Sequence, residues 1–278
     1  MTQSRESGGW ALVLGPGGPV GTAWLAGLAA GLRRAGLDPG AATPIVGTSA
    51  GAIAGAMIAT GRDLAAVAEL PPRGRERPPS DASVMGRAFE LTGDPDLDPD
   101  EVRRRIGRLA LEADTLPEER HRAGMEYLVG TDEWPGRRAG RARLLVTAVD
   151  VASGKPVVWD GSDDGVPLTA AVAASSAAPG FAEPVTIGGR RYMDGAFGGG
   201  SNAHLAAGTG PVVLIEPLPK MSGGSGADVR IVPDEGAREA FGDDVGDMAR
   251  WTPAYREGLR QAPAAAELIG SAIRGPAG

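Results

Sequence analysis

The chain has no cysteine, and its 278 residues include only two histidines, His121 and His204. The absence of cysteine excludes disulfide bonds, thiolate metal sites and a cysteine nucleophile. Long apolar runs are missing as well, and the N-terminus lacks the hydrophobic segment of a signal peptide. We therefore expect a cytoplasmic protein.

Basic residues are also in short supply. The chain has 28 Lys and Arg against 35 Asp and Glu, which gives a net charge of -7 at pH 7. Because an acidic chain repels polyanions, we expect no nucleic-acid partner. The apolar fraction of 42% can form a large core. No linker divides the sequence, which predicts one domain over residues 8–278.

Two strand–turn–helix units open the chain. Residues 10–14 are an apolar run that ends in a turn rich in glycine and proline, and residues 22–35 have a helical pattern. A second strand around residues 45–46 is followed by an Ala-rich helix over residues 51–60. Two such units in close succession predict parallel strands.

Strand patterns return in the second half of the chain. They predict two strand pairs and two further strands, at residues 143–150 with 155–160, 184–187 with 190–193, 212–216 and 229–232. Gly188-Gly189 joins the second pair as a hairpin turn. Helices are expected over residues 167–177 and from Ala237 onward. The pattern predicts an α/β protein, a three-layer α/β/α sandwich with a mainly parallel central sheet.

Residues 71–142 show no strand pattern and predict a helical insertion with long loops. Thr115 with Glu118 three residues later predicts a helix over residues 116–129. Either a lid with an interfacial docking face or ordinary core packing explains the local composition. The residues concerned are the arginine cluster at 137–143 together with Met125, Tyr127, Leu128 and Trp134.

The pattern from Gly47 to Gly51, Gly-Thr-Ser-Ala-Gly, stands between a strand and a helix, as in a nucleophile elbow. Ser49 would be presented on a tight turn, where Gly47 and Gly51 avoid collisions. Ala50 could offer its N–H to an oxyanion at the helix N-terminus. The alternative is a chance match in a chain with 44 glycines.

The turn from Gly15 to Gly21 also joins a strand to a helix. Its prolines lack an N–H, which leaves Gly17 and Gly18 as adjacent donors able to approach a substrate oxygen. A phosphate or dinucleotide site and a purely structural turn are the alternatives. The glycine spacing is one residue too long for the dinucleotide fingerprint, and no lysine follows as in a P-loop.

Four blocks in order resemble the patatin-like phospholipase family of lipid acyl hydrolases. They are residues 12–21, 47–51, 174–179 and 194–196. The resemblance implies a Ser-Asp dyad, with Ser49 as the nucleophile and Asp194 as its base. It also implies an oxyanion hole at Gly17 and Gly18.

Several supporting positions and partners follow from the same resemblance. Gly15, Gly21, Gly195 and Ala196 complete the family's motifs. The implied substrate is a lipid or small ester, with transient contact to a membrane surface, and neither a metal nor an organic cofactor is implied. Pro16 and Val20 depart from the family pattern, which has glycine and a basic residue there. The missing cation weakens the implied preference for phospholipids.

Two alternatives compete with the dyad. A Ser49-Asp194-His204 triad has the chain order of the α/β-hydrolases, although His204 follows Asp194 closely. A scaffold that binds a small lipidic or anionic ligand without turnover would use the same motifs. We expect His121, which has charged neighbours in the sequence, to be a solvated helix residue.

Overall fold

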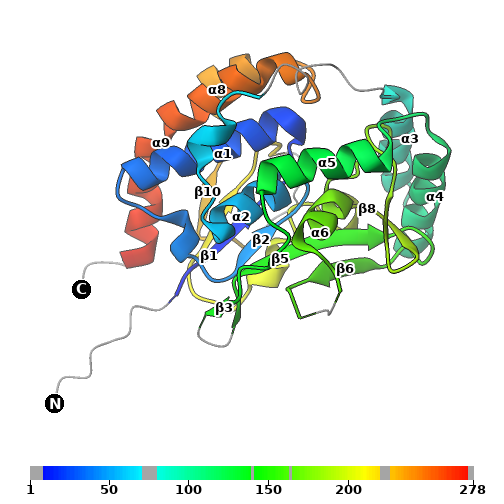
Figure 1. Cartoon of the computed structure of the whole chain (residues 1–278), viewed down its shortest axis with the longest axis horizontal. Helices are drawn as coiled ribbons and strands as arrows, with labels where there is room; N and C mark the ends of the chain where they lie inside the picture. Colours follow the sequence, from blue (N-terminus) through cyan, green and yellow to red (C-terminus); the bar gives the residue numbers. More distant parts are fainter. Residues whose placement is uncertain (1–8, 71–79, 139–140, 163–164, 220–225, 275–278) are drawn as a thin grey trace.

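The computed structural model describes residues 9–70, 80–138, 141–162, 165–219 and 226–274. A central sheet of eight strands has the order β10-β9-β1-β2-β5-β8-β7, with β6 paired to β5 (Figure 1). The strands are β1 (Ala11–Leu14), β2 (Ile45–Gly47), β5 (Leu144–Asp150), β6 (Pro156–Trp159), β7 (Val185–Ile187), β8 (Arg190–Asp194), β9 (Val212–Ile215) and β10 (Val229–Ile231). The strands from β10 to β5 are parallel, whereas β6, β7 and β8 pair antiparallel.

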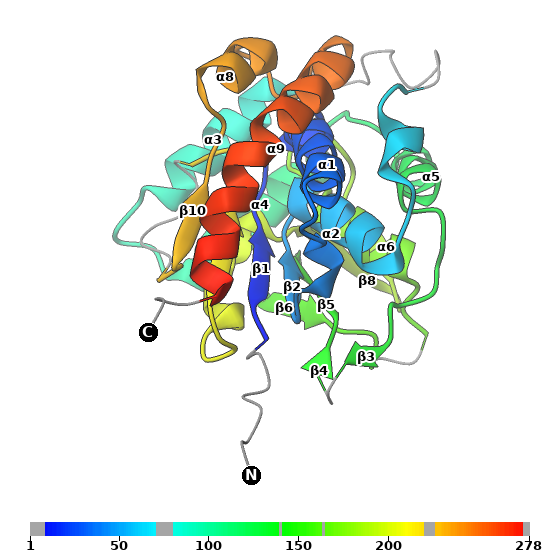
Figure 2. The same ribbon diagram turned by 90° about the vertical axis from the view of Figure 1, so that its left-hand side faces the viewer.

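Helices cover both faces of this sheet (Figure 2). Leu12 and Leu14 of β1 belong to a large core formed with α1 (Gly18–Arg34), α2 (Ala50–Thr60), α5 (Glu118–Val129), α6 (Leu168–Ser175), α8 (Glu235–Phe241) and α9 (Trp251–Arg274). Ala11 and Val13 alternate to the other face, against η4 (Ala203–Ala206). The predicted α/β sandwich with a mainly parallel sheet is therefore confirmed.

The third cluster of the core lies at the end of β5. Val149, Val151 and Met193 pack there against α3 (Ala82–Thr92) and α4 (Pro99–Glu112). Short one-turn elements complete the fold: α7 (Ala196–Gly199) and the 3-10 helices η1 (Pro39–Ala41), η2 (Leu64–Val67) and η5 (Met248–Arg250). In the part of the chain that the structure describes, no helix has the length and apolarity needed to span a bilayer.

The helices of region 71–142 in its described part are α3, α4 and α5. The prediction missed a two-stranded antiparallel sheet, β3 (Arg137–Arg138) with β4 (Arg141–Ala142), because strands of two residues show no periodicity. Met125 and Leu128 belong to the main core, whereas Tyr127 is 44% exposed. Residues 71–79 and the arginine side chains at 137–142 lie outside the described part. The single domain and the lid therefore stay predictions.

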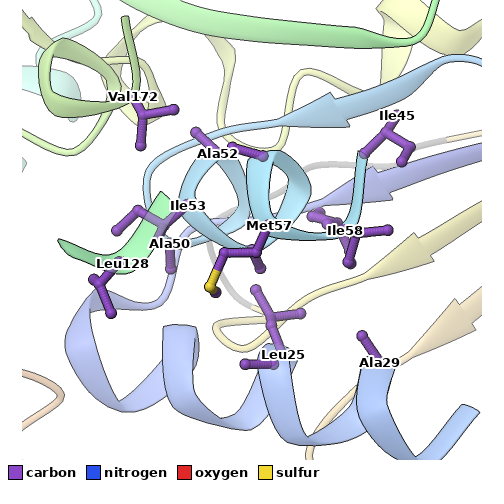
Figure 3. Close-up of a cluster of buried hydrophobic side chains, with 14 of the residues drawn as sticks. Leu25, Ala29, Ile45, Ala50, Ala52, Ile53, Met57, Ile58, Leu128 and Val172 are labelled. Carbon is purple, nitrogen blue, oxygen red and sulfur yellow. The ribbon is translucent and has the colours of Figure 1, made fainter. Parts of the chain in front are cut away.

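Helix α2 runs through the centre of the molecule. Figure 3 shows Ile53, Met57 and Ile58 among side chains from the neighbouring helices α1, α5 and α6. All of its residues from Ala50 to Ala59 are buried. A helix held on every side fixes the turn that precedes it, which is where Ser49 lies.

Helix α1 begins at Gly18, four residues before the predicted start. Pro19 occupies its first turn, where the missing N–H of proline costs nothing because no acceptor lies behind it. The prediction placed this proline in the loop. The difference matters for function, because it turns the glycine-rich segment into a helix N-terminus.

Candidate active site

Strands β2 and β8 meet end to end along one edge of β5. Strand β6 pairs with residues 146–149 of β5, a span that overlaps the residues paired with β2 and those paired with β8. Since a strand has only two edges, β2 and β8 must share the edge opposite β6. Gly47 is opposite Val146 and Asp194 is opposite Ala148, so they lie about 7 Å apart along β5. This topology brings the serine turn to the aspartate.

The turn at Ser49 is sterically constrained. Ser49 has φ 56° and ψ −120°, a combination that a residue with a side chain rarely adopts. A Cβ on Gly51 would overlap the carbonyl oxygen of Leu14, and one on Gly47 would lie 2.6 Å from Ala52 Cα. Both glycines are therefore required by close backbone approach, as the elbow predicts. The Ser49 N–H donates to Ser175 Oγ at 3.0 Å.

Asp194 is buried at the end of β8, with 2% of its surface exposed. The N–H of Ala196 donates to its carboxylate at 2.8 Å, and the Ser49 side chain is close enough to lower its pKa through hydrogen bonding. Burial outweighs both hydrogen bonds and raises the pKa of Asp194 to about 6. A carboxylate with this pKa is a better proton acceptor than an ordinary aspartate and is still ionised at neutral pH.

Three backbone N–H groups near the elbow are available for an oxyanion. Gly17 caps α1, Gly18 is its first residue, and Ala50 is the first residue of α2. The first N–H groups of a helix have no acceptor within it. Among the described residues, none of these three N–H groups donates to a protein acceptor outside the helices. A Cβ on Gly21 would lie 3.9 Å from Ala50 Cβ, so α1 and the elbow are neighbours.

The glycine-rich loop packs closely on two distant segments. A Cβ on Gly17 would lie 2.5 Å from Pro217 Cβ, and one on Gly21 would lie 2.8 Å from the same atom. The Val20 N–H donates to the carbonyl of Val245 at 3.1 Å. These contacts hold the loop without the basic residue that the family pattern has at position 20.

Glu216 lies behind the loop, and the sequence analysis missed it. Its side chain is 1% exposed and pairs with Arg230 at 2.6 Å. Burial raises the pKa of Glu216, and among the described residues its Oε1 has no hydrogen-bond partner. A Cβ on Gly15 would lie 3.4 Å from Glu216 Cγ. The only signal in the sequence is a charged residue directly after the apolar run of β9.

Asn202 connects the two halves of the site and was also missed. Its side-chain N–H groups lie within hydrogen-bonding distance of Thr48 Oγ1 (3.1 Å), Thr147 Oγ1 (3.3 Å) and the carbonyl of Gly195 (3.3 Å). The hydroxyls of Thr48 and Thr147 are themselves 2.9 Å apart. A Cβ on Gly195 would overlap the Thr147 carbonyl oxygen, which explains the glycine after the aspartate. The network joins the elbow, β5 and the end of β8.

The two histidines lie apart from this arrangement. His204 is exposed, and the hydrogen bonds to the Asp194 carboxylate come from Ser49 and Ala196 instead. The geometry therefore favours the dyad over the triad. The expectation for His121 was wrong: it is 7% exposed, its Nε2 lies 3.0 Å from the Ala173 carbonyl, and burial lowers its pKa. In the described ranges, no cluster of three or more His, Asp or Glu could hold a metal ion.

Comparison with solved structures gives several similar chains, among them the following three. VipD from Legionella pneumophila is 14% identical over 77% of this chain and 50% of its own, with a TM-score of 0.39. The type III effector ExoU is 16% identical over 95% and 54%, with a TM-score of 0.39. Human GIVD cytosolic phospholipase A2, in complex with methyl gamma-linolenyl fluorophosphonate, is 11% identical over 98% and 60%, with a TM-score of 0.41. The chain thus spans little more than half the length of these proteins.

A comparison with curated protein sequences finds no match. The sequence pattern of one family, described as patatin-like phospholipase, matches residues 12–207, which is more than half of the chain. This range contains the glycine-rich loop, the elbow, the β8 aspartate and Asn202. The chain therefore belongs to the patatin-like phospholipase family.

Proposed function

We propose that this protein is a serine acyl hydrolase that cleaves carboxylic esters of lipids through Ser49 and Asp194. The observation that carries the proposal is the contact between a strained serine and a buried aspartate whose pKa is raised to about 6. The family supports a lipid ester as the substrate class. The proposal covers phospholipids, lysophospholipids and simpler esters.

In the first half-reaction, Asp194 accepts the proton of the Ser49 hydroxyl while Oγ forms a bond to the ester carbonyl carbon. The carbonyl oxygen becomes an oxyanion, and the N–H groups of Gly17, Gly18 and Ala50 donate hydrogen bonds to it. The tetrahedral intermediate then collapses. The C–O bond to the alcohol breaks, Asp194 returns the proton to the departing oxygen, and an acyl-enzyme remains on Ser49.

Water completes the second half-reaction. Asp194 accepts a proton from a water molecule whose oxygen attacks the acyl carbon, and the same N–H groups hold the second oxyanion. Collapse breaks the bond to Ser49 Oγ, which takes the proton back from Asp194, and the carboxylic acid leaves. The cycle needs no group beyond the chain and water.

Covalent labelling tests the nucleophile. A fluorophosphonate probe should phosphonylate Ser49 of the native chain once, with fluoride as the leaving group. Intact-protein mass spectrometry should then show a gain of one probe mass less HF in the native chain and no gain in Ser49→Ala. Equal labelling of both chains would remove Ser49 from the mechanism. A native chain that neither reacts with the probe nor hydrolyses any ester in a lipid panel would favour the alternative of a binding scaffold without turnover.

A second comparison separates the dyad from the triad. Hydrolysis of a p-nitrophenyl ester should be lost in Asp194→Asn and retained in His204→Ala. The exposed position of His204 makes its substitution harmless to the fold. Loss of activity in His204→Ala as well as in Asp194→Asn would favour the triad. Loss in His204→Ala with full retention in Asp194→Asn would defeat the assignment of Asp194 as the base.

A further inference from the structure

A surface groove of about 360 Å³ lies between α4, the turn after β5 and the hairpin turn between β7 and β8. Its lining consists of Arg104, Arg108, Leu111, Val151, Ala152, Gly189, Arg190 and Arg191. Four of these eight residues are arginines and none is acidic. In a chain with a net charge of -7 this is a local reversal of charge.

The carboxylates next to the groove do not neutralise it. Glu101 is shared by three arginines, at 2.9 Å from Arg104, 2.9 Å from Arg105 and 3.3 Å from Arg108. Asp150 pairs with Arg190 at 2.7 Å. The four arginines of the groove therefore face two carboxylates, and one of these, Glu101, also binds Arg105 outside the groove.

The positive charge is accessible to a large ligand. The side chains of Arg108 and Arg190 are 57% and 58% exposed. Leu111, which also lines the groove, is 47% exposed. An exposed aliphatic side chain among arginines suits the headgroup region of an anionic membrane, where lipid phosphates meet the first methylene groups.

The groove lies next to the end of β5, the strand that pairs with the segments carrying Ser49 and Asp194. Val151 directly follows β5, and its N–H donates to the Arg191 carbonyl at 2.9 Å. Asp194 pairs with Ala148, three residues before Val151 on β5. The groove is therefore about 10 Å from the aspartate, measured along the strand. A membrane bound at the groove would lie close to the site of ester cleavage.

A second cleft provides an internal contrast. It has a volume of about 480 Å³ and is formed by α3 and α4. Its charged lining is balanced, with three arginines (Arg87, Arg105 and Arg108) and three acids (Glu90, Asp94 and Glu112). Balanced charge gives no preference for an anionic surface, so of these two clefts the groove beside the β7–β8 turn has the required polarity.

We propose that this groove, lined by Arg104, Arg108, Arg190 and Arg191, docks the protein on membranes that contain anionic lipids. The proposal rests on the proposed function only for the choice of a lipid surface as the partner. It also places a cationic site for phosphate outside the glycine-rich loop, in which Val20 occupies the position of the family's basic residue.

Vesicle co-sedimentation tests the proposal without turnover, in the full chain carrying Ser49→Ala. Binding to vesicles that contain phosphatidylglycerol should exceed binding to pure phosphatidylcholine and should weaken in high salt. Arg108→Glu removes one positive charge and adds a negative one, while Glu101 keeps Arg104 and Arg105. At roughly fivefold per unit charge, it should weaken binding about 25-fold.

A matched substitution controls for the overall charge of the chain. Arg256 on α9 is 72% exposed, and Arg256→Glu should bind phosphatidylglycerol vesicles like its parent. Arg191→Gln, which keeps a donor for the Pro184 carbonyl, should weaken binding about fivefold. Equal binding to both vesicle types would overturn the proposal, as would equal losses in Arg108→Glu and Arg256→Glu. Because Ser49→Ala cannot turn over lipid, failure here is distinct from failure of the labelling experiment.

Discussion

The serine and the aspartate of the site are held in place in different ways. Ser49 is positioned by its own neighbourhood in the chain, through Gly47, Gly51 and the buried helix that follows it. Asp194 is positioned by segments far away in the sequence. Its strand pairs with β5, and its turn is tied to Asn202 and Thr147.

This difference explains why one half of the site is a compact motif and the other is not. Steric exclusion acts over one or two bond lengths, so a strained turn requires glycines at fixed offsets. A buried carboxylate needs low polarity around it and only a few donors, and many side chains can provide this. We therefore expect substitutions in the turn around Ser49 to destabilise the fold. Substitutions of Asp194 should instead remove catalytic activity and leave the fold intact.

The largest expected effect on stability comes from a substitution in the turn that holds Ser49. Gly51→Ala places a methyl group onto the Leu14 carbonyl oxygen, so α2 must move away from β1. We expect a loss of roughly 3 kcal/mol or more in the free energy of unfolding, and a melting temperature lower by on the order of 10 °C. Thermal unfolding followed by circular dichroism measures this shift.

A second glycine-to-alanine change is the control for Gly51. Gly86 lies within α3, and a Cβ there would meet no atom within 4 Å. Gly86→Ala should stabilise the protein by up to about 1 kcal/mol through helix propensity. Equal melting temperatures for the two variants would mean that close approach of the backbone does not hold the elbow.

A substitution of Asp194 should lower activity and raise stability. Asp194→Asn keeps the shape of the side chain but cannot accept the serine proton, so we expect kcat for ester hydrolysis to fall by roughly 10³- to 10⁴-fold. Stability should rise, because the pKa of about 6 reports a buried charge that destabilises the folded state. The gain is on the order of 3 kcal/mol at neutral pH.

The sign of this gain depends on pH. Above pH 6 the native aspartate is ionised in both the folded and the unfolded chain, and the asparagine variant has its full advantage. Below the ordinary pKa of 3.8 both forms of the native chain are protonated, and the advantage disappears. Chemical denaturation at pH 8 measures the full gain, and the same measurement at a mildly acidic pH should give a smaller one. A variant less stable than the native chain at pH 8 would contradict the buried-charge explanation.

The same contrast shows what the sequence can predict. The elbow and the hairpin that ends at Asp194 were both predicted, because glycine spacing and strand alternation are local. Asn202 and Glu216 were missed, since their roles come from contacts across 154 and 201 residues, with Thr48 and Gly15 respectively. His121 was placed wrongly because its charged neighbours in the sequence point away from the core, where its ring accompanies Met125 and Leu128.

Removing the side chain of Asn202, which connects the Ser49 turn to the end of β8, should give an intermediate effect. Asn202 has φ 56°, so Asn202→Gly suits the backbone and deletes only the amide that contacts Thr48, Thr147 and Gly195. We expect kcat to fall by about 10- to 100-fold with little change in KM, because the serine and the aspartate lose their alignment.

Steady-state kinetics on a soluble ester measures this split between kcat and KM. Thr147→Ser keeps the hydroxyl and should retain most of the activity, whereas Thr147→Val should resemble Asn202→Gly. If Asn202→Gly lowers the melting temperature and leaves kcat unchanged, the network stabilises the fold and does not align the dyad.

The smallest expected effect is the pH dependence of the reaction, which reports the pKa of Asp194 directly. Only ionised Asp194 can accept the proton of Ser49, so kcat/KM should be constant above about pH 7 and fall tenfold per pH unit well below pH 6. A stopped assay with a short-chain ester across this range gives the profile. An unperturbed carboxylate would place the midpoint near 3.8 instead. A midpoint there would show that water reaches Asp194 and that burial does not set its basicity.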